Sequence, residues 1–304
     1  MRGSLEYFNR RSKDLLFEIP KPLSIGYSAY SANIGAMKNV GYEIQITGTP
    51  VRTNDLEWNI SLNATRYKNT ITALPQDQII SGNTLRRVGG SVYDFFLPEW
   101  AGVNPETGLP QWYKTDDKGN RVITENYNEA NTTESKIIAG TSLPDLSGGF
   151  GTDLRYGNFE FSALFAYSLG GKIYNGDKLS ILHNGSSAGR AMSIEMLGRW
   201  TPENTNADIP RLQTNNAYAW TSTSTRFLID ADYLRLKNIL VGYNIPKPVL
   251  ERIGLSDLKI YAQGENLLTV FGAEGIDPEQ TIGGSTYFRY PAMKTVSFGV
   301  NLSF

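Results

Sequence analysis

Cysteine is absent from this chain of 304 residues, and histidine occurs only once, as His183. The absence of cysteine excludes disulfides and thiolate metal sites, and a single histidine excludes a multi-histidine metal site. A chain without cysteine also suits an oxidising compartment such as a bacterial envelope. We therefore expect neither a metal nor another cofactor.

No stretch approaches 18 consecutive apolar residues, so the sequence predicts no transmembrane helix. Strands of a membrane barrel give much weaker signals, and they are not excluded. The net charge of −1 indicates no nucleic-acid partner. The first residues also lack the apolar segment of a secretory signal, so an exported protein with this sequence is expected to be a fragment or a processed piece.

Glycine and tyrosine are abundant, with 30 and 17 residues, and they favour an all-β fold. The last residues, 294–304, alternate without exception between apolar and small or polar side chains. Side chains of a strand point to opposite faces in turn, so this segment is predicted to be a strand with one apolar face. Its apolar members are Val296, Phe298, Val300, Leu302 and Phe304.

Similar alternation predicts about ten strands along the chain. Gly157 and Asn158 suit the tight turn of a hairpin. Around Lys237 the apolar phase slips, which predicts a β-bulge. The connections between these strands alternate between long and short, with expected bounds at 11–39, 50–55, 68–91, 99–109, 114–145, 157–158, 169–232, 244–257 and 269–293.

Strict alternation places the long loops at one end of a sheet and the short turns at the other. Outer-membrane barrels have this asymmetry, whereas β-sandwiches do not require it. The apolar faces of the clearest strands carry no charge, which both a lipid-facing surface and a soluble core demand. The sequence therefore predicts an antiparallel transmembrane β-barrel segment and leaves a soluble all-β glycan-binding module as the alternative.

Several blocks resemble SusC/RagA-type TonB-linked outer-membrane transporters, in the order in which that family has them. They span nearly the whole chain, and their combination is more specific than any one of them. The blocks are residues 6–17 (EYFNRRSKDLLF), 33–43 (NIGAMKNVGYE), 100–108 (WAGVNPETG), 199–204 (RWTPEN), 232–238 (DYLRLKN), 265–269 (ENLLT), 275–279 (GIDPE) and 290–291 (YP) with the terminal strand.

The resemblance implies a 22-stranded barrel with an internal plug domain, of which residues 1–304 would form the C-terminal part as a single domain. It implies TonB-driven import of glycans or peptides in the outer membrane, together with a SusD-like surface lipoprotein. The TonB system would act through an N-terminal part that is missing here, with the plug and the first half of the barrel. Ten strands that close a smaller barrel by themselves are an alternative that we consider weaker.

The resemblance also implies a role for the terminal strand. Gly299, Leu302 and Phe304 match the ending that the barrel assembly machinery recognises in outer-membrane proteins. Phe298 stands at a position that is usually polar in that signal. An ordinary amphipathic last strand is the alternative.

Catalytic motifs are weak, and we expect no enzyme. Residues 185–189 match the Gly-x-Ser-x-Gly elbow around Ser187, but the only histidine precedes the serine. Residues 148–151 lack the spacing of a phosphate loop, and close backbone packing is the better explanation. Residues 116–120 lack the spacing and the last glutamate of an EF-hand, so a polar turn is expected.

Aromatic residues gather in the segments predicted for the long-loop end. Aromatic faces stack on sugar rings, and Tyr and Trp add a hydrogen-bond donor. Trp220, Tyr218 and Tyr287 are the predicted ligand-binding residues, with Trp220 the strongest candidate. The same side chains, and Trp200 and Tyr290 with them, would alternatively pack loops or lie at the membrane interface.

The two hypotheses differ in one observable property. In a barrel, Ile60 and Val300 face outward into lipid, whereas in a soluble module they meet a second sheet in a dry core. The exposure of these two side chains therefore distinguishes the hypotheses.

Overall fold

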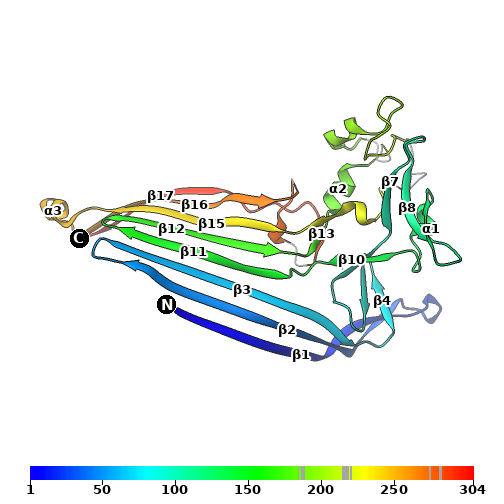
Figure 1. The fold of residues 1–304 in the computed structure, drawn as a ribbon, viewed down its shortest axis with the longest axis horizontal. Helices are drawn as coiled ribbons and strands as arrows, with labels where there is room; N and C mark the ends of the chain where they lie inside the picture. The colour runs from blue at the N-terminus through cyan, green and yellow to red at the C-terminus, as the bar shows by residue number, and fades with distance from the viewer. Residues whose placement is uncertain (184, 186–188, 214–218, 220, 274, 281–282) are drawn as a thin grey trace.

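The computed structural model describes residues 1–183, 185, 189–213, 219, 221–273, 275–280 and 283–304. A long antiparallel sheet of eight strands dominates the molecule (Figure 1). Its strands follow one another in the order of the chain. They are β1 (Arg2–Pro20), β2 (Ala29–Arg52), β3 (Leu56–Ala73), β11 (Leu146–Tyr156), β12 (Phe159–Leu169), β15 (Tyr233–Asn244), β16 (Asp257–Phe271) and β17 (Thr295–Ser303).

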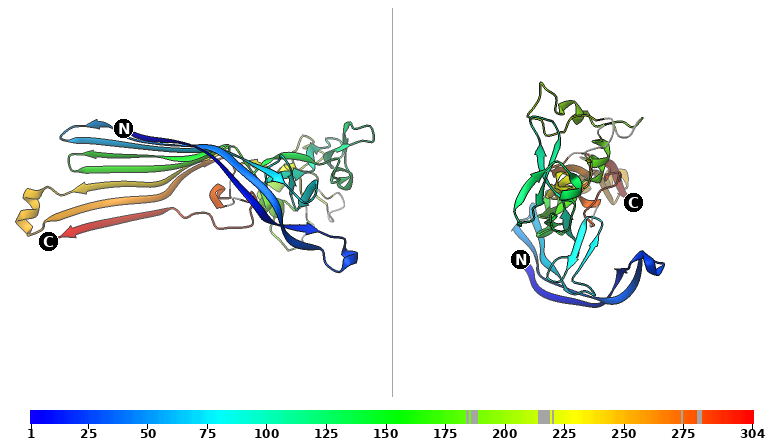
Figure 2. Two further views of the ribbon diagram at one scale, coloured as in Figure 1. Left: turned by 90° about the horizontal axis from the view of Figure 1, so that it is seen from below. Right: turned by 90° about the vertical axis from the view of Figure 1, so that its right-hand side faces the viewer.

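The sheet is curved and open (Figure 2). β1 forms one edge and β17 the other, and the two do not pair with each other. The antiparallel barrel segment predicted from the sequence is confirmed, and the segment does not close into a small barrel of its own. Each edge presents unpaired backbone groups, as an open sheet must.

The connections alternate between the two ends of the sheet as predicted, but the expected loop 11–39 is confined to residues 21–28, because β1 and β2 extend through the rest of that range. The turn end of the sheet carries residues 53–55, 157–158 and 245–256, with α3 (Lys247–Leu250) and η4 (Glu251–Ile253) in the last of them. The loop end carries residues 21–28, with η1 (Leu23–Ile25), and the longer connections 74–145, 170–232 and 272–294. Both chain termini lie at the turn end (Figure 1).

The long sheet has eight strands rather than the predicted ten, because the segments 92–98 and 110–113 belong elsewhere. β6 (Asp94–Leu97) lies in a four-stranded sheet with β10 (Ile137–Thr141), β5 (Thr84–Arg87) and β4 (Gln78–Ser81). β8 (Pro110–Thr115) lies between β7 (Glu99–Val103) and β9 (Arg121–Thr124). Removing two strands leaves the alternation between the two ends unchanged, but the lengths do not all follow the prediction, because the connection 21–28 at the loop end is shorter than the connection 245–256 at the turn end.

The outward face of the long sheet is apolar and uncovered. Ile60 is 39% exposed and Val300 is 61% exposed, and neither packs against a second sheet. Cross-strand neighbours continue this face from β1 to β17, as in Leu5 opposite Ile44. The exposure contradicts the dry core that the soluble alternative required and fits a lipid-facing surface.

Close backbone packing around residues 148–151 is confirmed. A Cβ atom added at Gly148 would lie 2.1 Å from the carbonyl oxygen of Asn63, and one at Gly149 would lie 2.7 Å from that of Phe165. These glycines let β11 approach both neighbouring strands closely, and a larger residue would push the strands apart. The segment is part of a strand and forms no phosphate loop.

The connections 74–145 and 170–232 form a lobe beyond the loop end of the sheet (Figure 1). The lobe holds the sheets of β4 to β10, the pair β13 (Lys172–Tyr174) and β14 (Leu228–Asp230), and four short helices. These helices are α1 (Tyr127–Ala130), α2 (Gly176–Ile181), η2 (Ile194–Gly198) and η3 (Thr225–Phe227); a fifth 3-10 helix, η5 (Pro278–Gln280), lies in the last loop. Within the described ranges, no helix is long and apolar enough to span a membrane.

The lobe contains a dry hydrophobic core. Its fully buried members come from both long connections, which explains how two segments that look irregular in the sequence fold together. The core residues are Phe95, Leu97, Trp112, Ala130, Tyr174, Leu182, Met196, Ile209 and Phe227. The helical turn predicted at 193–197 is confirmed as η2.

Candidate functional site

The predicted bulge in β15 is present and positions two cations. The register with β12 and β16 shifts between Leu236 and Asn238, so Lys237 is the extra residue. The bulge keeps Leu236 and Ile239 on the outward face, although three positions separate them. As a result, Arg235 and Lys237 both point to the inner face of the sheet.

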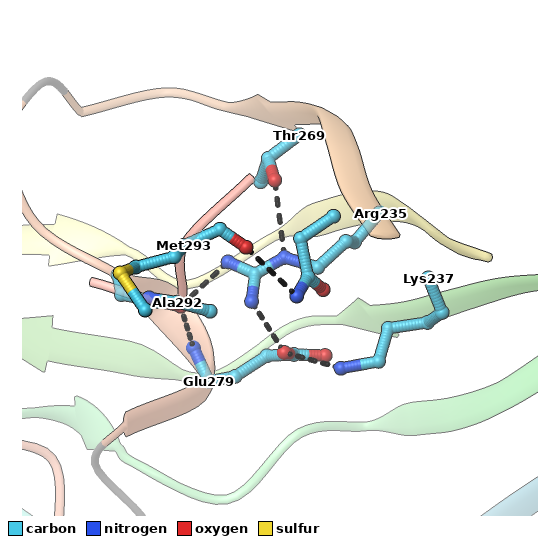
Figure 3. A network of polar contacts seen from close by, with 8 residues as sticks. Arg235, Lys237, Thr269, Glu279, Ala292 and Met293 are labelled. Atoms are coloured by element: carbon cyan, nitrogen blue, oxygen red, sulfur yellow. Dashed lines mark hydrogen bonds and ion pairs between the residues drawn. The ribbon is translucent and has the colours of Figure 1, made fainter. Parts of the chain in front are cut away.

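These two side chains hold the β16–β17 loop, residues 272–294, against the inner face (Figure 3). A nitrogen of Arg235 lies 2.6 Å from a carboxylate oxygen of Asp277, and a second nitrogen lies 2.5 Å from Glu279. Lys237 donates to the same Glu279 oxygen at 2.9 Å. Arg235 also donates to the hydroxyl of Thr269 at 3.0 Å. The loop carboxylates are therefore tied to β15, and Arg235 links this strand to β16 through Thr269.

Asp277 is the central acceptor of this network. Besides Arg235, it accepts the backbone N–H groups of Glu279 at 3.0 Å and Ala292 at 2.8 Å, so it joins the two ends of the loop. Burial alone would raise the pKa of the Asp277 carboxyl, but the hydrogen bonds from Arg235, Ala292 and Glu279 hold that pKa below its ordinary value of 3.8. The carboxyl is therefore ionised at neutral pH.

Burial makes the ion pair a strong local constraint. The side chains of Arg235 and Asp277 are only 4% and 1% exposed. Removing one member of a buried ion pair leaves the other charge uncompensated, which typically costs about 3–5 kcal/mol. The network therefore fixes Asp277 and Glu279 of the loop against β15.

A second set of contacts joins the loop to the lobe. Tyr174 donates its backbone N–H to Gly284 and accepts one from Thr286, at 2.6 and 3.1 Å. The carboxylate of Asp177 accepts the N–H of Phe288 at 2.6 Å. Anchors on the barrel wall and on the lobe thus support the segment between them.

This supported segment displays aromatic side chains. Tyr287 is 70% exposed, and Phe288 and Tyr290 are also exposed. Such a rigidly held group can contact a ligand with little loss of conformational entropy. The structure thus places Tyr287 where a ligand could reach it, and its role in binding stays a prediction. The other two predicted ligand-binding residues, Trp220 and Tyr218, lie outside the described residues.

Trp200 has a packing role. Its indole ring covers Gly108, where an added Cβ would lie 2.4 Å from the ring, and its N–H donates to the carbonyl oxygen of Pro105 at 3.0 Å. The alternative proposed for this tryptophan, that it packs a loop, is therefore the one the structure supports.

The residues of the predicted assembly signal lie in or next to β17. Gly299 is opposite Tyr261 of β16, and an added Cβ would lie 2.2 Å from the tyrosine ring. Glycine is thus required there by the ring that crosses it. Leu302 points outward opposite Leu258, and Phe304 follows the strand at 92% exposure. Recognition by the assembly machinery stays a prediction.

The weak chemical motifs gain no support. Ser187 of the elbow motif lies outside the described residues. The expected polar turn at residues 116–120 is confirmed, because the Asp116 carboxylate accepts the N–H groups of Lys118 and Asn120 at 2.9 and 2.8 Å. No group of three or more metal-ligating side chains occurs within the described part of the chain.

The ionic network itself was not predicted from the sequence. Its members belong to two of the blocks that carry the resemblance, residues 232–238 and 275–279, but nothing in the sequence paired them. The sequence offered one signal for this network, namely that Arg235 and Lys237 lie next to a predicted bulge. Cations inside a membrane-spanning strand usually have partners, so these two could have been expected to form ion pairs.

An open antiparallel sheet with an uncovered apolar outer face and a polar inner face defines a segment of an outer-membrane β-barrel. No protein-family model matches the chain. It is 33% identical over 329 residues to TonB-dependent receptor P3 of Formosa agariphila, covering 99% of this chain and 32% of the relative. It is 27% identical to the TonB-dependent receptor SusC of Bacteroides thetaiotaomicron, with 99% of this chain and 30% of SusC covered.

Among solved structures, the RagAB peptide transporter matches with a TM-score of 0.84 and 26% identity, over 99% of this chain and 33% of the other. The chain thus spans about a third of the length of these relatives. The matches confirm the resemblance to the barrel portion of SusC/RagA-type TonB-dependent receptors, and with it the outer-membrane location. The relatives are receptors and transporters, in agreement with the expectation that the chain is not an enzyme.

Proposed function

We propose that this chain forms the C-terminal barrel part of an outer-membrane transporter that imports glycans or peptides. In this proposal, a plug domain and the remaining barrel strands complete the transporter. Energy comes from the TonB system, and a SusD-like surface lipoprotein delivers the substrate. The similarity to SusC and to the RagAB peptide transporter supports the proposal.

The observation that carries the proposal is the β16–β17 loop. A loop tied to the inner wall by a buried ion pair, with exposed aromatic side chains, is suited to guide a ligand at the mouth of the barrel. Aromatic rings contact both sugars and apolar peptide side chains, so this feature is compatible with either substrate class.

The proposal is tested on the complete receptor with its surface lipoprotein. We expect Tyr287→Ala to weaken substrate binding about fivefold or more, as measured by titration calorimetry with oligosaccharides and with peptides. Tyr156→Ala is the matched control, because Tyr156 is also exposed but lies on the outward face at the turn end. If cells carrying the complete receptor gained no TonB-dependent uptake of either class, the proposal would be wrong.

We also propose that β17 carries the assembly signal of the barrel. Its alternating apolar face and the exposed Phe304 at its end support this role. Val296, Phe298 and Val300 are all more than half exposed, and in the complete protein the lipid of the outer membrane would cover them.

A further inference from the structure

The outward face of the long sheet changes character partway along β1 and β2. Tyr7 and Tyr42 lie opposite each other there, with ring centroids 5.3 Å apart. Towards the turn end from this pair the outward residues are apolar, beginning with Leu5 and Ile44. Level with the pair or towards the loop end from it, the same face carries four cations, which we call the basic belt: Arg11, Lys38, Arg66 and Lys68.

The register shows that the belt shares the outward face with the apolar residues. On β2, Ile44, Tyr42 and Lys38 are separated by even numbers of positions, so they point to the same side. Cross-strand pairing extends this face, because Arg66 lies opposite Tyr42, Lys68 lies opposite Val40, and Lys38 lies opposite both Arg11 and Thr70. The four cations therefore form one patch over three neighbouring strands.

The position of the belt matches the edge of a membrane. On β2 the apolar outward residues extend from Val51 to Tyr42, about the ten residues that a tilted strand needs to cross a bilayer. Tyrosine rings commonly mark the boundary between hydrocarbon and headgroups. β2 continues past this boundary to Ala29, so the belt lies at the level of the headgroups on the loop side.

The two ends of the sheet differ in this respect. Phe159 and Tyr243 form an outward aromatic pair at the turn end, with centroids 4.7 Å apart. No lysine or arginine of the eight strands points outward beyond that pair, in a part of the chain that the structure describes completely. The belt is therefore specific to the loop side of the membrane.

Three cations of the inner face are paired within the chain, whereas three of the four belt cations form no ion pair within its described part. Arg155 pairs with Glu57, Lys259 with Glu160, and Arg235 with Asp277. By contrast, Arg11, Lys38 and Arg66 form no ion pair with any described residue. Cations that are not paired within the chain and that lie at the level of the headgroups attract the anions of a membrane surface.

A hollow beside the belt adds a place for a headgroup. Arg66, Lys68 and Arg87 line it together with Tyr42, and the lobe closes its far side with Asp94 and Asp145. Guanidinium and ammonium groups donate charge-assisted hydrogen bonds to phosphate oxygens, and several donors around one group bind it tightly.

We propose that the basic belt binds the phosphate-bearing headgroup of an anionic lipid in the outer leaflet, with Arg11, Lys38, Arg66 and Lys68 as the ligands of the phosphate. This inference depends on the membrane placement of the sheet and not on the proposed transport. A receptor that imports no glycan or peptide could still bind the lipid, so the two proposals fail separately.

The test uses the complete receptor in nanodiscs of phosphatidylcholine, with lipid A as the phosphate-bearing probe. We expect the double variant Arg11→Gln, Arg66→Gln to bind lipid A about tenfold more weakly, as counted by native mass spectrometry of the retained lipid. The matched control is Arg10→Gln, Arg155→Gln, which removes the same charge from the inner face of β1 and β11. The control should retain lipid A like the unaltered receptor.

A further variant, Arg11→Lys, Arg66→Lys, separates loss of charge from misfolding, and we expect it to keep most of the binding. Equal retention by the outward and inward double variants would overturn the proposal, as would full retention by the outward one. Lipid A with its phosphates removed should bind poorly to every variant, and tight binding of that probe would also overturn the proposal.

Discussion

The long sheet and the lobe are built for opposite surroundings. In the sheet, large apolar side chains such as Phe298 and Val300 point away from the protein, and polar side chains line the inner face. In the lobe, the large apolar side chains of Trp112 and Phe95 are instead fully buried in a core. The difference shows that one chain can use the same alternating strands in lipid and in water, because the surrounding solvent decides which face is covered.

The largest effect is expected in the core of the lobe. Trp112 is 0% exposed and packs edge-on against Trp100 and Tyr127. Trp112→Ala should destabilise the lobe by about 3–5 kcal/mol, because it leaves a cavity in a dry core. Hydrogen exchange of residues 94–141 in the complete receptor would measure this. Trp58→Ala, on the lipid-facing surface, should leave the exchange of these residues unchanged. An equal effect of the two variants on that exchange would contradict the difference between the lobe and the sheet.

A similarly large but local effect is expected at the junction between the two regions. Asp277→Ala leaves Arg235 buried without its main partner, so the β16–β17 loop should lose about 3–5 kcal/mol of local stability. Faster hydrogen exchange at residues 284–292 would report it. Asp230→Ala is the control, because Asp230 pairs with Lys172 at the surface, where its side chain is 74% exposed.

The same junction should respond to acid. The pKa of Asp277 is lower in the folded protein than its ordinary value of 3.8, so the folded state favours the ionised form. Its contribution is therefore complete above pH 3.8 and is lost as the pH falls below that value. Exchange at residues 284–292 should accelerate in this range in the unaltered receptor and not in Asp277→Ala; identical profiles would contradict the assignment.

A smaller effect is expected from a charge on the sheet. Ile60→Lys places an ammonium group on the lipid-facing surface and should cost about 2–4 kcal/mol near the bilayer midplane. Ser61→Lys places it one position along on the inner face and should cost little. Urea titration of the folded receptor in lipid vesicles would compare the two. Similar stabilities of the two variants would contradict the assignment of the outward face to lipid.

The smallest effect on the stability of the folded protein is expected at Phe304. This side chain is 92% exposed, so Phe304→Ala should leave stability and ligand affinity unchanged in protein that has inserted. If β17 carries the assembly signal, the amount of protein inserted in the outer membrane should nevertheless fall. Quantifying the receptor in isolated outer membranes tests this, and normal insertion would count against the signal.

Local patterns predicted a large part of the fold. The terminal strand, the tight turn at Gly157 and Asn158 and the bulge at Lys237 depend on residues that are close in the chain, and all three are present. The place of segment 92–98 did not follow in the same way. Alternation identifies a strand, but β6 pairs with β10, some 40 residues further along the chain, as well as with β5, and only packing selects these partners.

The candidate site shows the same limit. Tyr287 could be selected as an exposed aromatic residue of a loop, but its support could not, because Arg235 and Asp277 are 42 positions apart. The pairing requires the bulge, the inward turn of the loop and the burial of both charges at once. The basic belt could not be predicted from the sequence either, since its members lie on three strands and come together only through the pairing register of those strands.

By itself, the sequence determined that this protein is built of antiparallel strands with one apolar face, because a period of two is a local property of the chain. It also determined which connections lie at the same end of the sheet. The tertiary structure decided that the apolar face is the uncovered outer one, that two strands leave the barrel for a lobe with its own core, and that buried charges hold the last loop inside. Apolar alternation has the same form in lipid and in a dry core, so only the arrangement of the strands in space could separate the two.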